Sequence, residues 1–229
     1  MTFPVPTSNV TMFSGWRAIS VPFGILAAIF IAEFGPDTRT AQAVQFCAKV
    51  LTGLPSILAG VFAYAAVVVV TGGFSAPAGG IALAILMLPT VLLTAEEAIK
   101  RVPPKMREAA IGMGATPTQV VLRIVLPTAL PGVATGVLLA VARAAGETAP
   151  LLFTALFSDY WISRTSPEFL PKTLGELMKP TASLAVLIYN FSGSPFDNQI
   201  DLAWAAALVL VAIVLIVNVA GRALARRSG

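Results

Sequence analysis

The sequence predicts an all-α polytopic membrane protein, a helical bundle that crosses the lipid bilayer several times. Two observations carry this prediction. Of the 229 residues, 57% are hydrophobic and only 11% are charged, whereas soluble domains carry about 25% charged residues. The mean hydropathy is +0.85, which leaves too little polar surface to coat a water-soluble globule. We therefore expect much of the exterior to face lipid.

The charge and the cysteine content exclude several kinds of function. The net charge of +4 comes from 15 Lys and Arg residues, which fall in hydrophilic gaps between apolar runs and so indicate orientation in a membrane rather than a nucleic-acid surface. One cysteine and no histidine leave no ligand set for zinc and no Cys–His nucleophile. Without histidine or a pair of intramembrane carboxylates, a membrane-embedded enzyme is disfavoured as well. We expect no metal site and no catalytic residue.

Each expected span is an apolar stretch that can cross a hydrocarbon layer of about 30 Å, which takes about 20 helical residues. In chain order the expected spans are 18–33, 44–70, 76–95, 126–157 and 203–221. The first of them is short, and segment 1–17 before it lacks the basic start and long apolar core of a signal peptide. Counted back from a cytoplasmic C-terminus, five spans would put residue 1 outside, so either an earlier helix is missing or the first span is only the second half of one. We expect 1–17 to be the remnant of a truncated N-terminus and 18–221 to be one transmembrane domain.

Basic residues orient these spans, because Lys and Arg gather on the cytoplasmic side. The gap after the third span and the tail 222–229 are rich in them: Lys100, Arg101, Lys105, Arg107, Arg123, Arg222, Arg226 and Arg227. The long connection 158–202 has three basic and five acidic side chains. We therefore expect the gap and the C-terminus in the cytoplasm, and the connection 158–202 on the outer face.

The cytoplasmic gap contains a short helix, expected over 105–114, with clear ends. Pro103 and Pro104 precede it and Gly114 closes it, which are the positions where proline and glycine are favoured. The capping-box pattern of Thr116, Pro117 and Gln119 then predicts a new helix from Pro117. A helix of small residues can dock closely on a partner, with one carboxylate to register against a basic group. The alternative is an ordinary amphipathic helix lying on the membrane surface.

The residues of this gap also carry a resemblance. Glu108-Ala109-Ala110, Gly114 and Ile124-Val125-Leu126-Pro127 match the EAA-xxx-G-x9-I-x-LP signature of ABC importer permeases at every defined position. The chain thus resembles that family, which implies a type I importer (MetI-like) fold in which 105–114 is a coupling helix that docks on a cytoplasmic ATPase. The residues implied to couple to the ATPase are Glu108, Ala109, Ala110, Gly114, Ile124, Leu126 and Pro127.

A charged pair interrupts the fourth span. At 3.6 residues per turn, one face within an arc of roughly 80° holds Gly132, Gly136, Ala140, Arg143 and Glu147. Because a charge facing lipid is costly, this face is expected to point into a helix interface or a pore. Two interpretations stay open: the charges of Arg143 and Glu147 neutralise each other within the bundle, or Arg143 presents its guanidinium to an oxyanion beside Glu147. We take Arg143, Glu147 and Thr148 as candidate residues of a translocation pathway.

Segment 142–155 and the later run 179–190 closely resemble the A-type permease subunits of bacterial phosphate ABC importers, and the resemblance extends from about Ile19 onward. It implies a multi-pass permease of the bacterial plasma (inner) membrane that carries inorganic phosphate and binds no cofactor itself. The implied partners are membrane lipid, a second, C-type permease, two ATPase subunits that bind ATP, and an extracytoplasmic phosphate-binding protein. A permease for another oxyanion, such as sulfate or molybdate, and a passive membrane channel are the alternatives. A passive channel would not need an ATPase-docking helix.

Overall fold

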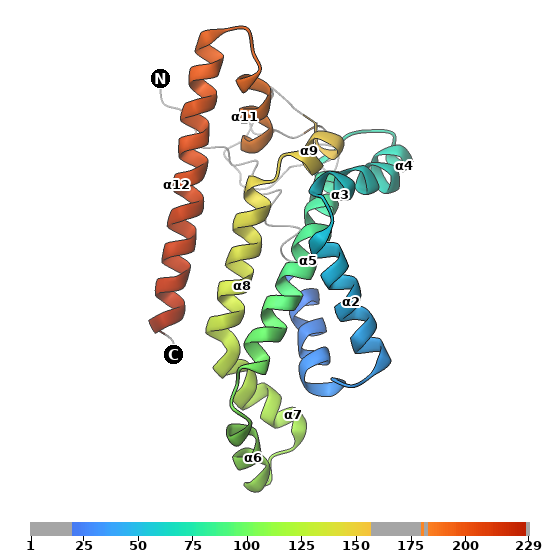
Figure 1. Ribbon diagram of the computed structural model, residues 1–229, viewed down its shortest axis with the longest axis vertical. Coiled ribbons are helices and arrows are strands. Elements are labelled where there is room, and N and C mark those ends of the chain that lie inside the picture. Colours follow the sequence, from blue (N-terminus) through green and yellow to red (C-terminus); the bar gives the residue numbers. More distant parts are fainter. Residues whose placement is uncertain (1–19, 157–179, 181–182, 228–229) are drawn as a thin grey trace, which may run out of the picture. The chain divides into compact units, whose positions relative to one another are not determined.

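The computed structural model describes residues 20–156, 180 and 183–227, and within these residues every regular element is helical (Figure 1). In chain order the elements are a first helix Ser20–Phe34, α2 (Arg39–Gly53), α3 (Ser56–Ala63), α4 (Val69–Thr71), α5 (Ala76–Lys100), α6 (Pro104–Gly112), α7 (Pro117–Val120), α8 (Leu126–Gly146), α9 (Ala149–Thr154), α11 (Leu184–Ser192) and α12 (Asp197–Arg227). The predicted remnant 1–17 and the part 158–179 of the predicted outer connection lie outside the described residues.

Three helices are long and apolar enough to cross a membrane: Ala76–Lys100, Pro117–Gly146 and Asp197–Gly221. A fourth candidate is the broken pair Arg39–Gly53 and Ser56–Thr71, if the pair is one span. The first helix, Ser20–Phe34, is apolar but shorter. The prediction of an all-helical, multi-pass chain is thus confirmed.

The stretch 44–70, expected to be one span, is two helices. The break falls at Leu54 and Pro55, and Pro55 has an extended ψ of 133°. Proline has no amide hydrogen to donate, and it disfavours the helical region for the residue before it. The proline therefore divides the stretch into two helices, which remain one candidate span if the break lies within it.

The third span continues beyond its predicted end at residue 95. Its last turns carry two ion pairs with the i,i+4 spacing that supports a helix, Glu96–Lys100 and Glu97–Arg101, each at 2.6 Å. The charged residues therefore extend α5 to Lys100, and the helix ends shortly before Pro103, as the proline requires.

The last two predicted boundaries also differ. The span expected over 126–157 is divided, because α8 ends at Gly146 and α9 begins at Ala149. The connection expected over 158–202 holds a helix, α11, whose first turn is capped by the Ser183 hydroxyl accepting from the Val186 amide at 3.2 Å. The last span begins at Asp197 rather than at 203, with the acidic side chain at the N-terminus where the helix dipole favours it.

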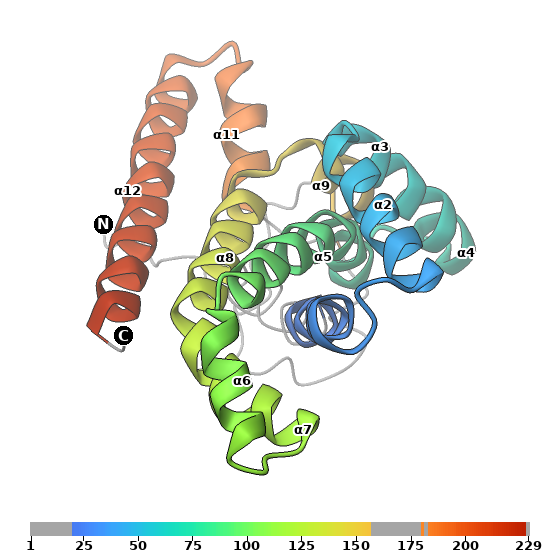
Figure 2. The ribbon, with the colours of Figure 1, turned by 60° about the horizontal axis from the view of Figure 1, so that its bottom comes forward.

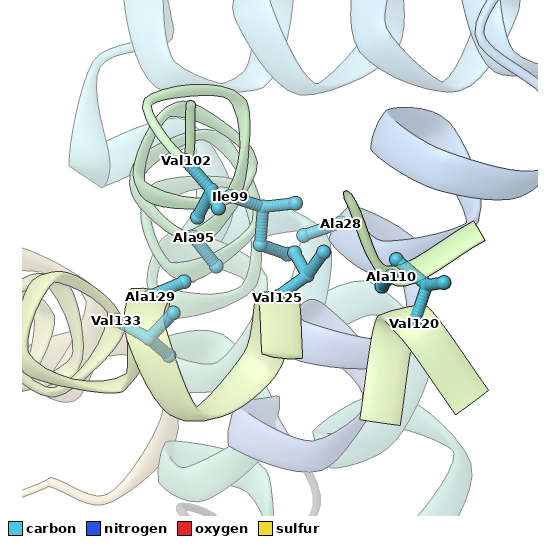
Figure 3. Close-up of a cluster of buried hydrophobic side chains, with 9 residues drawn as sticks. All are labelled: Ala28, Ala95, Ile99, Val102, Ala110, Val120, Val125, Ala129 and Val133. Carbon is cyan, nitrogen blue, oxygen red and sulfur yellow. The ribbon is translucent and has the colours of Figure 1, made fainter. Parts of the chain in front are cut away.

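The chain groups into two compact units. Unit 1 contains 54–86 and 143–215, and unit 2 contains 20–53, 87–142 and the end of α12. In unit 2, nine buried apolar side chains form one cluster (Figure 3): Ala28, Ala95, Ile99, Val102, Ala110, Val120, Val125, Ala129 and Val133. The cluster joins the first helix, α5, α6, α7 and α8, so the short helices α6 and α7 are packed against the long ones.

Within unit 2, the glycine face of α8 packs against α5. A Cβ atom at Gly132 would lie 2.8 Å from the Cβ of Ala98, and one at Gly136 would overlap the Thr94 side chain. Ala140 on the same face is buried. The small residues allow the two helices to lie side by side (Figures 1 and 2). Of the two predicted destinations of this face, the glycines therefore lie in a helix interface.

Candidate functional site

Helix α6 ends in a tight turn at Gly114, as the sequence predicted, although the helix itself runs over Pro104–Gly112 rather than 105–114. Gly114 has φ +86°, in the left-handed region that favours glycine. Its amide donates to the Ile111 carbonyl at 2.9 Å, and the Ala115 amide donates to the Ala110 carbonyl at 3.1 Å. These are the two hydrogen bonds of a Schellman motif, which reverses the chain after α6.

The helix that follows begins at Pro117, and the predicted capping box is confirmed. The Gln119 amide donates to the Thr116 hydroxyl at 3.4 Å, and the Thr116 amide donates to the Gln119 side-chain oxygen at 2.9 Å. A π-helical turn, Val121–Val125, then leads into α8 next to Pro127. Two short helices joined by a fixed turn thus project from the end of α5 (Figure 2).

The seven signature residues do not share one surface. Ala110 is buried in the core cluster, and Ile124 and Leu126 pack against that cluster. The other four are exposed: Glu108, Ala109, Gly114 and Pro127. The signature therefore combines residues that fix α6 to the long helices with residues that a partner can reach.

Sequence reasoning missed the apolar side chains that α6 and its turn expose. Met106, Ile111 and Met113 are exposed and lie among the exposed signature residues. Ile111 and Met113 occupy undefined positions of the signature and Met106 precedes it, so only their apolar character could have indicated them. Together with Glu108 and Ala109 they form the exposed surface of α6, which offers apolar contacts and one carboxylate.

The candidate pathway residues lie together in unit 1, where α8 gives way to α9. Arg143 is in the last turn of α8, and its Nε lies 3.6 Å from Oε1 of Glu147. The side chains are 42% and 15% exposed. Thr148 caps α9 through its backbone, since its carbonyl accepts from the Leu151 and Leu152 amides at 3.1 Å. The structure thus brings all three predicted residues to one helix junction.

Contacts within unit 1 hold α9, and with it this junction, in place. A Cβ atom at Gly60 of α3 would lie 2.6 Å from the Cα of Pro150, so glycine permits the close approach of the two helices. Thr154 is buried, its hydroxyl donates to the Pro150 carbonyl at 2.7 Å, and its own carbonyl accepts from the Ser75 amide at 3.1 Å. Glu147 and Thr148 therefore precede a well-anchored helix.

The Arg143–Glu147 arrangement suits an oxyanion that carries a proton. At 3.6 Å the pair is longer than a good charge-assisted hydrogen bond, about 2.7–2.9 Å, and the exposed guanidinium has planar donors available for a tetrahedral oxyanion. The Glu147 carboxylate can only accept hydrogen bonds when ionised. One group can therefore donate to the anion while the other accepts from a protonated oxygen.

Sequence reasoning also missed two charge clusters in unit 2. Arg107 pairs with Glu33 at 2.9 Å. The buried Glu96 accepts from both Gln45 Nε2 and Lys100 Nζ at 2.6 Å. The position of Glu33 and Glu96 at the ends of apolar stretches could have indicated that they need partners. No local pattern points to Arg107 and Gln45 as those partners.

Comparison with known proteins shows the family to which this chain belongs. Residues 20–229 match the family model described as "Binding-protein-dependent transport system inner membrane component". The chain is 39% identical to the phosphate transport system permease protein PstA of Xylella fastidiosa strain 9a5c, over 92% of this chain and 69% of that protein. It is 42% identical to PstA of Haemophilus influenzae, over 88% and 67% of the two chains, and 35% identical to a probable PstA of Methanocaldococcus jannaschii, over 88% and 67%.

A solved structure shares the fold. An inward-facing structure of the MetNI methionine ABC transporter superposes with a TM-score of 0.71 at 20% identity, covering 97% of this chain and 91% of that one. The predicted MetI-like fold and the predicted relation to the phosphate importer permeases are confirmed. The chain belongs to the family of binding-protein-dependent transport system inner membrane components, the permease subunits of ABC transporters.

Proposed function

We propose that this chain is the A-type permease subunit of an ATP-driven phosphate importer and forms half of its translocation pathway. The observation that carries the proposal is α6. Its inner side is fixed to the long helices through Ala110, while Glu108, Ala109 and the neighbouring apolar side chains are exposed. A short helix held in this way can pass a displacement at its exposed surface to the helices that cross the membrane.

In this proposal the chain hydrolyses nothing and binds no cofactor. ATP is bound by two ATPase subunits, which contact the exposed surface of α6. A second, C-type permease supplies the other half of the pathway, and an extracytoplasmic binding protein delivers phosphate. The family description, with its binding-protein-dependent transport system, supports this assembly.

Phosphate is proposed as the cargo on two grounds. Relatives that share 39–42% of their residues with this chain are named phosphate transport permeases. In addition, Arg143 can donate to the anion while Glu147 accepts from it, with Thr148 beside them. Inorganic phosphate keeps a proton near neutral pH and can donate it to Glu147, whereas sulfate and molybdate have none to offer and would be repelled by the carboxylate.

The proposed orientation places α6 and the C-terminus in the cytoplasm, in a bacterial inner membrane. A cysteine introduced into 158–202 should react with a membrane-impermeant thiol reagent in intact cells, and a cysteine beside Lys105 should not. Cys47 is exposed, so it must be replaced before either measurement. Labelling beside Lys105 but not beside Lys172 would invert the orientation.

The proposed function is tested by complementation. A bacterial strain that lacks its phosphate permease should regain uptake of radiolabelled phosphate when it expresses this chain with its C-type partner, and excess sulfate or molybdate should not compete. Uptake of sulfate or molybdate in place of phosphate would favour the other oxyanions. Phosphate entry that persists without the ATPase subunits would favour a passive channel.

A further inference from the structure

The guanidinium of Arg107, in α6, joins three separate segments of unit 2. Its Nη2 lies 2.9 Å from Oε1 of Glu33, near the end of the first helix. The same nitrogen donates to the Ile99 carbonyl, in the last turn of α5, at 2.9 Å. One side chain of α6 therefore contacts the ends of the first helix and of α5.

This contact differs from an ordinary surface ion pair. The side chains of Arg107 and Glu33 are only 26% and 9% exposed, so water screens the pair less than it screens surface charges. Arg107 also places positive charge against the C-terminal carbonyls of α5, where the helix dipole favours a cation. Nη2 alone lies within 2.9 Å of both acceptors, so one end of the guanidinium holds the two helix ends together.

Glu33 has an unfavourable position unless Arg107 is present. An acidic group near the C-terminal end of a helix is opposed by the helix dipole, and a buried charge needs a partner. Glu33 lies in the last turn of the first helix, and its one ion pair within the described residues is with Arg107. A neutral side chain would serve packing better, so the pair calls for a reason other than stability.

We propose that Arg107 is a positioning residue for energy coupling: it clamps α6 to the first helix and to α5, so that displacement of α6 by an ATPase subunit moves these helices with it. The inference rests on the proposed function, in which α6 meets the ATPase. Without the clamp, α6 is joined to α5 by the short link through Pro103 and by apolar contacts of small side chains such as Ala110. Those contacts let α6 pivot, whereas the charged clamp fixes its direction.

The test uses the whole transporter reconstituted in lipid vesicles, with anion uptake and ATP hydrolysis measured together and divided by the amount of assembled complex. The variants are Arg107→Lys, Arg107→Met, Glu33→Gln and the double variant Arg107→Met with Glu33→Gln. The matched control is the exposed pair Glu97–Arg101, at 2.6 Å with 66% and 76% of the side chains exposed, removed by Glu97→Gln with Arg101→Gln. Uptake per ATP hydrolysed is the readout, because a role confined to folding changes the amount of complex and not this ratio.

We expect the double variant to assemble, since it leaves no buried unpaired charge. Its anion uptake per ATP hydrolysed should fall by about fivefold or more. Arg107→Lys keeps the charge but loses the fork, and should recover part of the ratio. The control should keep the ratio of the unaltered chain. A double variant with the full ratio would overturn the clamp and reduce the pair to a structural contact, and so would a control that loses the ratio equally.

The unaltered complex is assayed in parallel with phosphate, sulfate and molybdate. If it carries sulfate or molybdate instead of phosphate, the proposed cargo is wrong, and the variants are compared with the anion it does carry. If it carries phosphate with a normal ratio and the double variant matches it, the clamp alone is wrong.

Discussion

Two Arg–Glu pairs of this chain have opposite character. Arg143 and Glu147 are four residues apart, 3.6 Å from each other, and 42% and 15% exposed. Arg107 and Glu33 come from different helices, approach to 2.9 Å, and are 26% and 9% exposed. The first pair is loose and open to a ligand, and the second is closer, more buried and also tied to a backbone carbonyl.

The difference indicates separate tasks. Arg143, in the last turn of α8, and Glu147, just after that helix, are close along the chain and join no distant segments, so the donors of Arg143 can be given to an anion. A pair between helices orders the segments that it joins, and Nη2 of Arg107 also donates to the Ile99 carbonyl. Charge in an apolar chain is costly, and we propose that Arg143 serves the access of an anion while Arg107 connects helices.

The largest effect is expected from Arg143. Arg143→Gln should lower phosphate uptake by about tenfold or more, because one charge-assisted hydrogen bond contributes about 1.5–3 kcal/mol and 1.4 kcal/mol corresponds to a factor of ten. The double variant Arg143→Gln with Glu147→Gln should insert and assemble yet remain equally poor in uptake. Membrane abundance, ATPase assembly and uptake are measured for both single variants and the double.

These variants decide whether Arg143 and Glu147 bind the anion or only neutralise each other. If Arg143 and Glu147 only neutralise each other, removing both charges leaves nothing unpaired, and uptake should return. Near-normal uptake by a well-assembled double variant would show that Arg143 and Glu147 have only a structural role and that neither binds the anion.

A smaller effect is expected at the exposed surface of α6. A Cβ added at Gly114 would meet no atom within 4 Å, but the side chain of Gly114→Val at φ +86° costs about 1–2 kcal/mol. Glu108→Lys reverses the one acidic charge of that surface. Both variants should reach the membrane normally and lose several-fold in uptake, measured with ATPase co-purification. Unchanged uptake together with unchanged ATPase association in both would remove the coupling role of α6.

Part of this arrangement could be predicted from the sequence, because it is fixed locally. The turn at Gly114 and the cap at Thr116 depend on residues at most five positions apart, and both were predicted. The break at Pro55 is also a local feature, because proline has no amide hydrogen for the helix. Local patterns therefore predict the ends of helices well when each residue is given its conformational preference.

The remaining features depend on residues that only the fold brings together. Arg107 is a basic residue in a basic segment, and nothing nearby shows that it meets Glu33. The glycines of α8 indicated a close helix neighbour, but only the structure identifies it as α5, through Thr94 and Ala98. Sequence spacing thus predicted which residues of a helix face inward, but it did not identify the residues that they contact.

A still smaller effect on uptake is expected at the contact between α3 and α9, which holds the helix that follows Glu147 and Thr148. Gly60→Ala would place a Cβ 2.6 Å from the Pro150 Cα, so α3 and α9 must separate, at about 1–3 kcal/mol. Because α9 follows Glu147 and Thr148 directly, we expect lower thermal stability in detergent and about two- to threefold less uptake. Gly53→Ala, where a Cβ meets no atom within 4 Å, is the matched control. Equal stability of the two variants would show that the approach of α3 to α9 is not needed.

The smallest effect is expected at the exposed pair Glu97–Arg101. Exposed pairs at this spacing contribute about 0.3–0.5 kcal/mol, so Arg101→Gln should leave stability, assembly and uptake nearly unchanged. A several-fold loss of uptake would show that charge at the end of α5 matters in general. Arg107 would then no longer be distinguished by its burial and its two acceptors.

The central claim is that this chain forms part of an ATP-driven pathway for phosphate. It is tested most directly in lipid vesicles that contain the reconstituted transporter, with its binding protein supplied on the outer face and ATP on the other. We expect accumulation of radiolabelled phosphate that requires both hydrolysable ATP and the binding protein and that excess sulfate does not reduce. Phosphate entry that proceeds at the same rate without ATP, or accumulation of sulfate in its place, would contradict it.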